Sequence, residues 1–221
     1  MIHTFSMKVI TQEEVSNSSP YCNKTFDHII ARDIDFSAID IAGCSFSHSE
    51  FVRCVFRGCA MTECRMDMSE FNSCDFSGAR LEKVSARRSV FLVCEIESAY
   101  AEGSDFSATQ FNSCNMDSCD MNNAILHGVQ FCRCNTRGMH LNGADMTGAN
   151  IDYSAWPMWC GSYGVKVDRR LFEQLVMHLC GVVVDDREYW NVQQTLKSIA
   201  MRHPRAQEFL CLREDDENDK D

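Results

Sequence analysis

Several features are scarce or missing in this chain of 221 residues. Lys and Arg number 21 against 32 Asp and Glu, a net charge of −11, which argues against a broad surface for nucleic acid or an anionic membrane. No segment approaches the ~18 apolar residues of a membrane span. The N-terminus has no basic stretch followed by an apolar one, so we expect no secretory signal, a cytoplasmic location and reduced thiols.

Familiar catalytic and metal-binding motifs are also missing. The 14 Cys include no Cys-x-x-Cys pair, the commonest zinc and thioredoxin-type spacing. There is no Gly-rich phosphate loop, Gly-x-Ser-x-Gly elbow or His-Glu-x-x-His. His127 and His140 have no Cys or acidic neighbour at a spacing that indicates a catalytic pair. We therefore expect no enzyme activity, no catalytic residue, no metal and no cofactor.

A five-residue repeat dominates what is present. From Phe26 to Ile151, the positions whose numbers end in 1 or 6 hold eleven Phe, five Met, three Leu, three Ile, three Ala and one Thr. The position two residues earlier is mostly small, with nine Cys, five Ala and four Ser among twenty-two sites. Eight of the eleven Gly fall two residues after the large position, where a tight turn favours conformational freedom.

A period of five matches neither a helix nor a plain strand. It fits a short extended segment, in which residues two apart face inward together, followed by a corner. Four corners close a square coil of twenty residues, and successive coils should lie ~4.8 Å apart. Five Phe then stack on one inner wall and five Cys on the next: Phe51, Phe71, Phe91, Phe111 and Phe131, and Cys54, Cys74, Cys94, Cys114 and Cys134.

The Cys rows have two interpretations. One is a thiol ladder for metal or redox chemistry, and the other is packing, because Cys shares its register with Ala and Ser and behaves as a small hydrophobe. Spacing favours packing, since ~4.8 Å exceeds the Cβ separation that a disulfide prefers. The Cys outside the register are the ones expected to be exposed: Cys22, Cys132, Cys160, Cys180 and Cys211.

The repeat units "CDFSG", "SDFSA", "CDMNN" and "GADMTGANID" resemble the A(D/N)LXX signature of the pentapeptide-repeat proteins over residues 26 to about 155. The resemblance implies an all-β solenoid, a right-handed quadrilateral parallel β-helix of about six and a half coils. This chain differs by using Cys where Ala is usual and Phe or Met where Leu is usual. Both swaps keep small and large residues in place.

The two ends differ from the repeat. We expect an N-terminal cap segment over residues 1–25, the β-helix over 26–155, a small α-helical cap over 156–213 and an acidic disordered tail over 214–221. "MKVITQEEV" suggests a short strand or helix. Asp168 is placed to cap a helix. The cluster of Trp156, Pro157, Trp159 and Cys160 is interpreted as a plug at the end of the column, with ligand binding as an alternative. Trp156 and Trp159, with Leu171 and Leu175, are also a candidate dimer or cap interface for a second copy or a partner.

The outward positions suggest two functions. Asp75, Glu95, Glu97 and Asp117 form an acidic face, and Val90, Leu92 and Val93, near Val52, form an apolar one. We expect a non-catalytic, rigid protein-binding scaffold with an unidentified protein partner. The family resemblance implies an alternative, imitation of DNA by an acidic rod that binds type II topoisomerase, as in quinolone resistance. Bases interrupt the acids here, and the unbroken repeat leaves no inserted loops, so the alternative is weaker.

Overall fold

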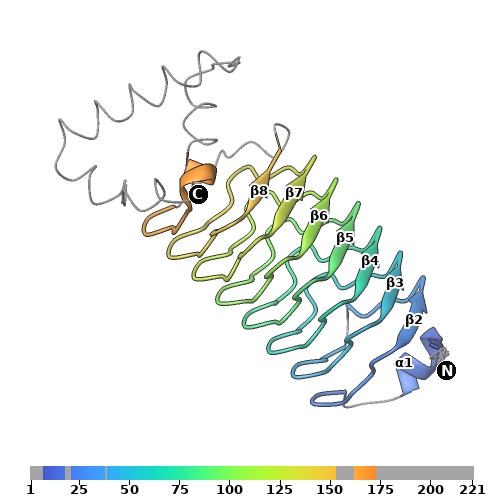
Figure 1. Ribbon diagram of the computed structural model, residues 1–221. Helices are drawn as coiled ribbons and strands as arrows, with labels where there is room; N and C mark the ends of the chain where they lie inside the picture. The colour runs from blue at the N-terminus through green and yellow to red at the C-terminus, as the bar shows by residue number, and fades with distance from the viewer. Residues whose placement is uncertain (1–6, 18–20, 38, 153–161, 173–221) are drawn as a thin grey trace, which may run out of the picture. The chain divides into compact units, whose positions relative to one another are not determined.

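A computed structural model describes residues 7–17, 21–37, 39–152 and 162–172. Within them, eight short strands pair in sequence order as one parallel sheet (Figure 1). The strands are β1 (Lys8–Ile10), β2 (Ile29–Arg32), β3 (Glu50–Val52), β4 (Glu70–Asn72), β5 (Val90–Leu92), β6 (Gln110–Asn112), β7 (Gln130–Cys132) and β8 (Asn150–Ile151); one helix, α1 (Gln12–Asn17), follows β1. The chain divides into two units, residues 1–167 and 168–221, which are described separately.

The first unit is a four-walled coil. The strands form one wall, and isolated parallel bridges form the other three, as in the pairs Asp75–Glu95, Arg80–Tyr100 and Ser85–Asp105. From β2 to β8, each residue pairs with the residue twenty positions later. The stacked coils are seen from the side in Figure 1. The predicted quadrilateral parallel β-helix is therefore confirmed.

The column inside the coil is filled by the large residues of the repeat. Phe51, Phe71, Phe91, Phe111 and Phe131 are all buried, and their rings stack with centroids 4.8–5.4 Å apart. These separations match the spacing of hydrogen-bonded strands. The five Cys of the second row are buried as well. Because residues two apart share a face of an extended segment, both rows point inward.

The corners require a backbone conformation that the Gly pattern only partly revealed. Every described residue from 23 to 148 whose number ends in 3 or 8 has a positive φ. Eight of these are Gly, but seventeen are not, and they include Val93 at φ 54°. A β-branched residue is rare in this conformation because its side chain crowds the backbone. The regular stacking of the coils thus holds non-Gly corners in place.

Buried thiols and hydroxyls link neighbouring coils. The Cys94 thiol donates to the backbone oxygen of Phe71 at 3.4 Å. The buried Ser89 hydroxyl donates to the backbone oxygen of Met66 at 2.6 Å and accepts the Ser69 N–H at 3.2 Å. Small residues of the repeat therefore fill space and also satisfy backbone groups that the turns leave free.

Replacing Cys94 by Ala should lower the free energy of unfolding by about 1 kcal/mol or less, because the change in volume is small and a thiol is a weak donor. Urea unfolding monitored by circular dichroism measures the difference. A loss larger than that of Phe91→Ala would show that the Cys row is bonded to something and not merely packed.

The ends of the coil shift the register by one residue. β1 pairs with β2 at an interval of 21, Lys8 opposite Ile29. Thr11 and Glu14 exchange backbone-to-side-chain hydrogen bonds of 3.0 and 3.3 Å, a capping box that starts α1. At the other end Lys166 pairs with Asp145, again at 21. Lys166 therefore still forms a parallel bridge with the coil, although the sequence predicts the repeat only to about residue 155.

The second unit is described only over residues 168–172. The Leu171 N–H donates to the Asp168 carboxylate at 2.8 Å, and residues 169–172 are helical. Asp168 thus caps the helix that the sequence predicted to begin there. The remainder of the expected helical cap and the acidic tail lie outside the described residues.

Candidate interaction surfaces

The acidic face forms on the wall that follows the strands. Asp75 pairs with Glu95 on the next coil, and Glu95 with Asn115. Glu97 and Asp117 lie two residues after the last two, on the same wall. The structure therefore brings together the four acidic residues that the sequence grouped. The Asn115 amide donates to Glu95 at 2.9 Å and to Glu97 at 3.4 Å, which ties the two carboxylates together.

A base interrupts this acidic wall at one end. Arg57 forms an ion pair with Asp75, and the Ser77 N–H donates to the same carboxylate at 2.9 Å. Partial burial opposes ionisation, but the hydrogen bonds from Ser77 and Arg57 outweigh it and lower the pKa of Asp75. The wall therefore presents a short acidic stretch of Glu95, Glu97 and Asp117 rather than a continuous row of charge.

The wall formed by the strands carries an apolar patch at β5. Val90 and Leu92 are half-buried, and Val93 at the next corner is 59% exposed. We call these three residues the β5 patch. Asn72 lies between Leu92 and Val52, because Val52 pairs with Asn72 and Asn72 with Leu92. Val52 is therefore separated from the patch by one coil.

A partly buried ion-pair network occupies a third wall. Asp67 accepts hydrogen bonds from the Ser85 hydroxyl at 2.6 Å, from the Arg87 N–H at 2.9 Å and from the Arg87 guanidinium at 2.8 Å. Its side chain is only 12% exposed. Burial works against the charge, but the bonds from Arg87 and Ser85 lower the pKa of Asp67. The network joins two coils across the outside of the column.

On the same wall, His127 has an acidic partner that the sequence did not indicate. The sequence offered no acidic neighbour at a recognisable spacing, yet His127 Nε2 lies 3.1 Å from a carboxylate oxygen of Asp145, one coil away. Lys166 lies 3.5 Å from the same carboxylate. Bonds from Thr147 and His127 outweigh partial burial and hold the pKa of Asp145 well below its usual range. A separation of 18 residues becomes a contact only because twenty residues complete a coil.

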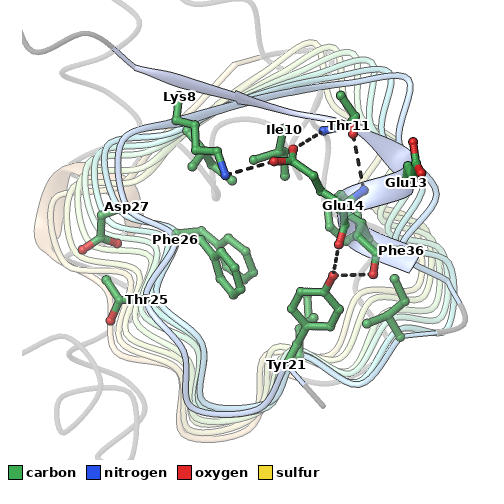
Figure 2. Close-up of a pocket in the computed structure, with 15 residues that line it drawn as sticks. Lys8, Ile10, Thr11, Glu13, Glu14, Tyr21, Thr25, Phe26, Asp27 and Phe36 are labelled. Atoms are coloured by element: carbon green, nitrogen blue, oxygen red, sulfur yellow. Dashed lines mark hydrogen bonds and ion pairs between the residues drawn. The ribbon is translucent and has the colours of Figure 1, made fainter. Parts of the chain in front are cut away.

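The N-terminal end of the column is hollow (Figure 2). The hollow has a volume of about 730 Å³, and Phe26, Phe36 and Phe46 line it beside α1. Lys8 and Glu14 form an ion pair of 3.1 Å at its edge, and the Tyr21 hydroxyl donates to the backbone oxygen of Glu14 at 2.8 Å. Its walls are mainly apolar, and these polar groups already bond to one another.

Burial keeps three thiols of the repeat in the protonated form. Desolvation raises the pKa of Cys59, Cys64 and Cys119 to about 12, so these three are poor nucleophiles. Cys22 and Cys132 are half-buried, whereas Cys160, Cys180 and Cys211 lie outside the described residues. Within residues 7–17, 21–37, 39–152 and 162–172, no group of three or more His, Cys, Asp or Glu side chains is spaced to hold a metal.

The expected cap interface is described at one residue only. Leu171 is buried. Trp156, Trp159 and Leu175 lie outside the described residues, so the suggested dimer or plug remains a prediction. Over the described part of the chain, no helix has the length and apolar character needed to cross a bilayer.

Comparison with known proteins was made with sequence families and with solved structures. The family model for pentapeptide repeats (8 copies) matches residues 32–67, 94–128 and 124–154. No curated protein sequence matches the chain. A trypsin-treated form of QnrB1, a plasmid-mediated fluoroquinolone resistance protein, is 17% identical; the match covers 80% of this chain and 95% of that one, with a TM-score of 0.34.

Two cyanobacterial structures are similar as well. Rfr23 from Cyanothece 51142, a pentapeptide repeat protein, is 10% identical over 67% of this chain and 86% of its own, with a TM-score of 0.28. HetL from Nostoc sp. strain PCC 7120, a pentapeptide repeat protein involved in heterocyst differentiation regulation, is 12% identical over 70% and 91%, with a TM-score of 0.18. The repeat matches and the four-walled coil built from them show that this chain belongs to the pentapeptide-repeat proteins.

Proposed function

We propose that this protein is a non-catalytic scaffold that binds another protein in the cytoplasm, and that the β5 patch is its contact surface. The observation that carries the proposal is Val93, an apolar side chain that is 59% exposed and held at φ 54°. Eight other corners in the repeat use Gly at no steric cost. Residues in an unfavourable backbone conformation persist mainly where function requires them. Val93 therefore indicates a contact whose free energy outweighs the cost of its positive φ.

The scaffold presents this patch rigidly. β5 is hydrogen-bonded between β4 and β6, and the rings beneath it are stacked at 4.8 and 5.0 Å. A surface that is already ordered loses little entropy on binding. The neighbouring outward residues are polar: Glu70 lies opposite Val90 on one side and is charged, whereas Asn72, Gln110 and Asn112 are uncharged. An apolar centre with a polar rim is the usual composition of a protein interface.

Val93→Asn tests the proposal. Asn tolerates a positive φ far better than Val, so the free energy of unfolding should rise by about 1 kcal/mol. Binding of the partner protein should be lost at the same time. The wild type and the variant are used as baits in native lysate, and the captured proteins are quantified by mass spectrometry. Urea unfolding measures the stability.

Ala108→Asn is the matched control. Ala108 is an exposed corner residue at φ 57° on a different corner of the coil, so this change should leave capture unaltered. Equal capture by the wild type and by Val93→Asn would remove the β5 patch from the proposal.

The acidic wall supports a second candidate, imitation of DNA toward a type II topoisomerase. Glu95, Glu97 and Asp117 gather on one wall, as such a role requires. A duplex, however, carries a charge every ~1.7 Å, and Arg57 neutralises Asp75. Inhibition of gyrase supercoiling at micromolar protein, relieved by Glu95→Gln with Glu97→Gln, would favour this candidate. No effect of the wild type would exclude it.

A further inference from the structure

The hollow at the N-terminal end of the column is large enough to hold a ligand. Its volume of about 730 Å³ lies within the roughly 300–1,000 Å³ that small-molecule sites occupy in proteins. Residues of α1 and of the first two coils line it, and the side chains of Tyr21 and Phe26 point into it (Figure 2). We call it the N-terminal hollow.

The stack of Phe rings ends at the N-terminal hollow. Inside the column, Phe71 has a nearly parallel ring on either side, at 4.9 and 4.8 Å. Phe26 stacks on Phe46 at 5.4 Å, but Tyr21 contacts the Phe26 ring at 5.6 Å with the two planes 47° apart. Over the described part of the chain, no second parallel ring reaches Phe26. An aromatic ligand in the hollow can therefore extend the stack by one ring.

The walls of the N-terminal hollow favour an apolar occupant. Its aliphatic lining consists of Ile10, Val15, Ile29, Ile39 and Ile41. Phe26 and Ile39 are only half-buried, so both keep apolar surface that a ligand can remove from water. The Tyr21 hydroxyl already donates to the backbone oxygen of Glu14 at 2.8 Å. Water molecules would therefore find few polar partners there, which makes them easy to displace.

The charged groups at the N-terminal hollow disfavour an anion. Lys8 is the one base among the described residues that line it, and Lys8 pairs with Glu14 at 3.1 Å. Glu13 and Asp27 add two more acidic side chains. An anionic ligand would therefore meet charge of its own sign, and the one nearby base is already engaged.

We propose that the N-terminal hollow binds a small aromatic molecule that carries no negative charge. One ring of the ligand stacks on Phe26, and the rest packs against the Ile side chains of the walls. The site is separate from the β5 patch and does not depend on the proposed protein partner.

NMR of the full chain with N-phenyl-1-naphthylamine, an uncharged aromatic probe, tests the site. The Ile methyl groups are labelled with ¹³C, because the ring current of a bound probe shifts the methyl signals beside it. The signals of Ile39 and Ile41 should shift as the probe is added. Ile96, buried within the column, and Ile125, which is 39% exposed, are the internal controls. No shift at Ile39 and Ile41, or equal shifts at the controls, would overturn the proposal.

Anilinonaphthalene sulfonate provides the comparison for charge, because it has the same aromatic skeleton and one added sulfonate. Both probes fluoresce more strongly when they leave water, so fluorescence titration gives a Kd for each. We expect the sulfonate to bind about fivefold more weakly, as a like charge nearby in water would require. Equal or tighter binding of the sulfonate would contradict the proposed ligand class.

Ile39→Phe is the matched variant. The larger side chain takes up part of the N-terminal hollow and should weaken binding of the uncharged probe by roughly tenfold. Val93→Asn alters the β5 patch instead and should leave probe binding unchanged. Urea unfolding shows whether each variant is folded, and the NMR result on the wild type stands without either. Unchanged binding by folded Ile39→Phe, or an equal loss in Val93→Asn, would overturn the proposal.

Discussion

Replacing Phe91 by Ala should lower the free energy of unfolding by about 3–5 kcal/mol, the largest loss expected from any single truncation discussed for this chain. The ring is 2% exposed. It stacks on Phe71 at 4.8 Å and on Phe111 at 5.0 Å, and it meets the edge of Phe76 at 5.8 Å. Removing it opens a cavity in the middle of the column, where the hydrogen-bonded coils on both sides cannot close in.

Tyr100→Ala is the control for this prediction. Tyr100 is an aromatic residue of the same coil, two walls after Phe91, and is 54% exposed, so its truncation should change stability by less than about 0.5 kcal/mol. Urea unfolding of both variants gives the comparison. Equal losses for Phe91→Ala and Tyr100→Ala would contradict a packed column of Phe rings.

Replacing Asp67 by Ala should cost about 2–3 kcal/mol at neutral pH. The carboxylate is 12% exposed and accepts bonds from Ser85 and from both the backbone and the guanidinium of Arg87. Its loss leaves these donors without their acceptor near the surface of the column. Asp33→Asn is the comparison, because the Asp33–Arg53 pair is about 60% exposed on both sides and should contribute about 0–1 kcal/mol.

The effect of Asp67 should depend on pH in one direction. Its pKa is lower in the folded protein than in the unfolded chain, so its stabilisation is complete above the unfolded pKa and is lost as the pH falls through the folded value. The difference in stability between the wild type and Asp67→Ala should therefore be full at neutral pH. Below about pH 4 it should shrink. A difference that stays constant to low pH would show that the charge of Asp67 is not involved.

The side chains that fill the column can be predicted directly from the sequence. A small residue two before a large one, repeated every five residues without interruption, has one regular solution in which both point inward. Phe91 and Cys94 were placed inside on that basis, and both are buried. The capping role of Asp168 was equally local, because it depends on residues within one helical turn.

Contacts between coils were harder to predict. His127 and Asp145 are 18 residues apart, and Asp67 and Arg87 are 20 apart. Interactions at such distances follow from how the walls turn and which rotamers the side chains adopt, not from local spacing. The signal that would have found both contacts is the twenty-residue interval itself, applied to polar residues.

The sequence by itself determined the coil, its four walls and the residues that fill it, because the alternation of side-chain volume permits one regular way to bury them. Only the tertiary structure decided which outward groups meet, since each contact joins residues on different coils and depends on corner conformation. It also showed that Val93 holds a positive φ angle that a β-branched residue disfavours. Hydrogen bonding between coils imposes that angle, and the Gly register indicates it only at the corners where Gly itself stands.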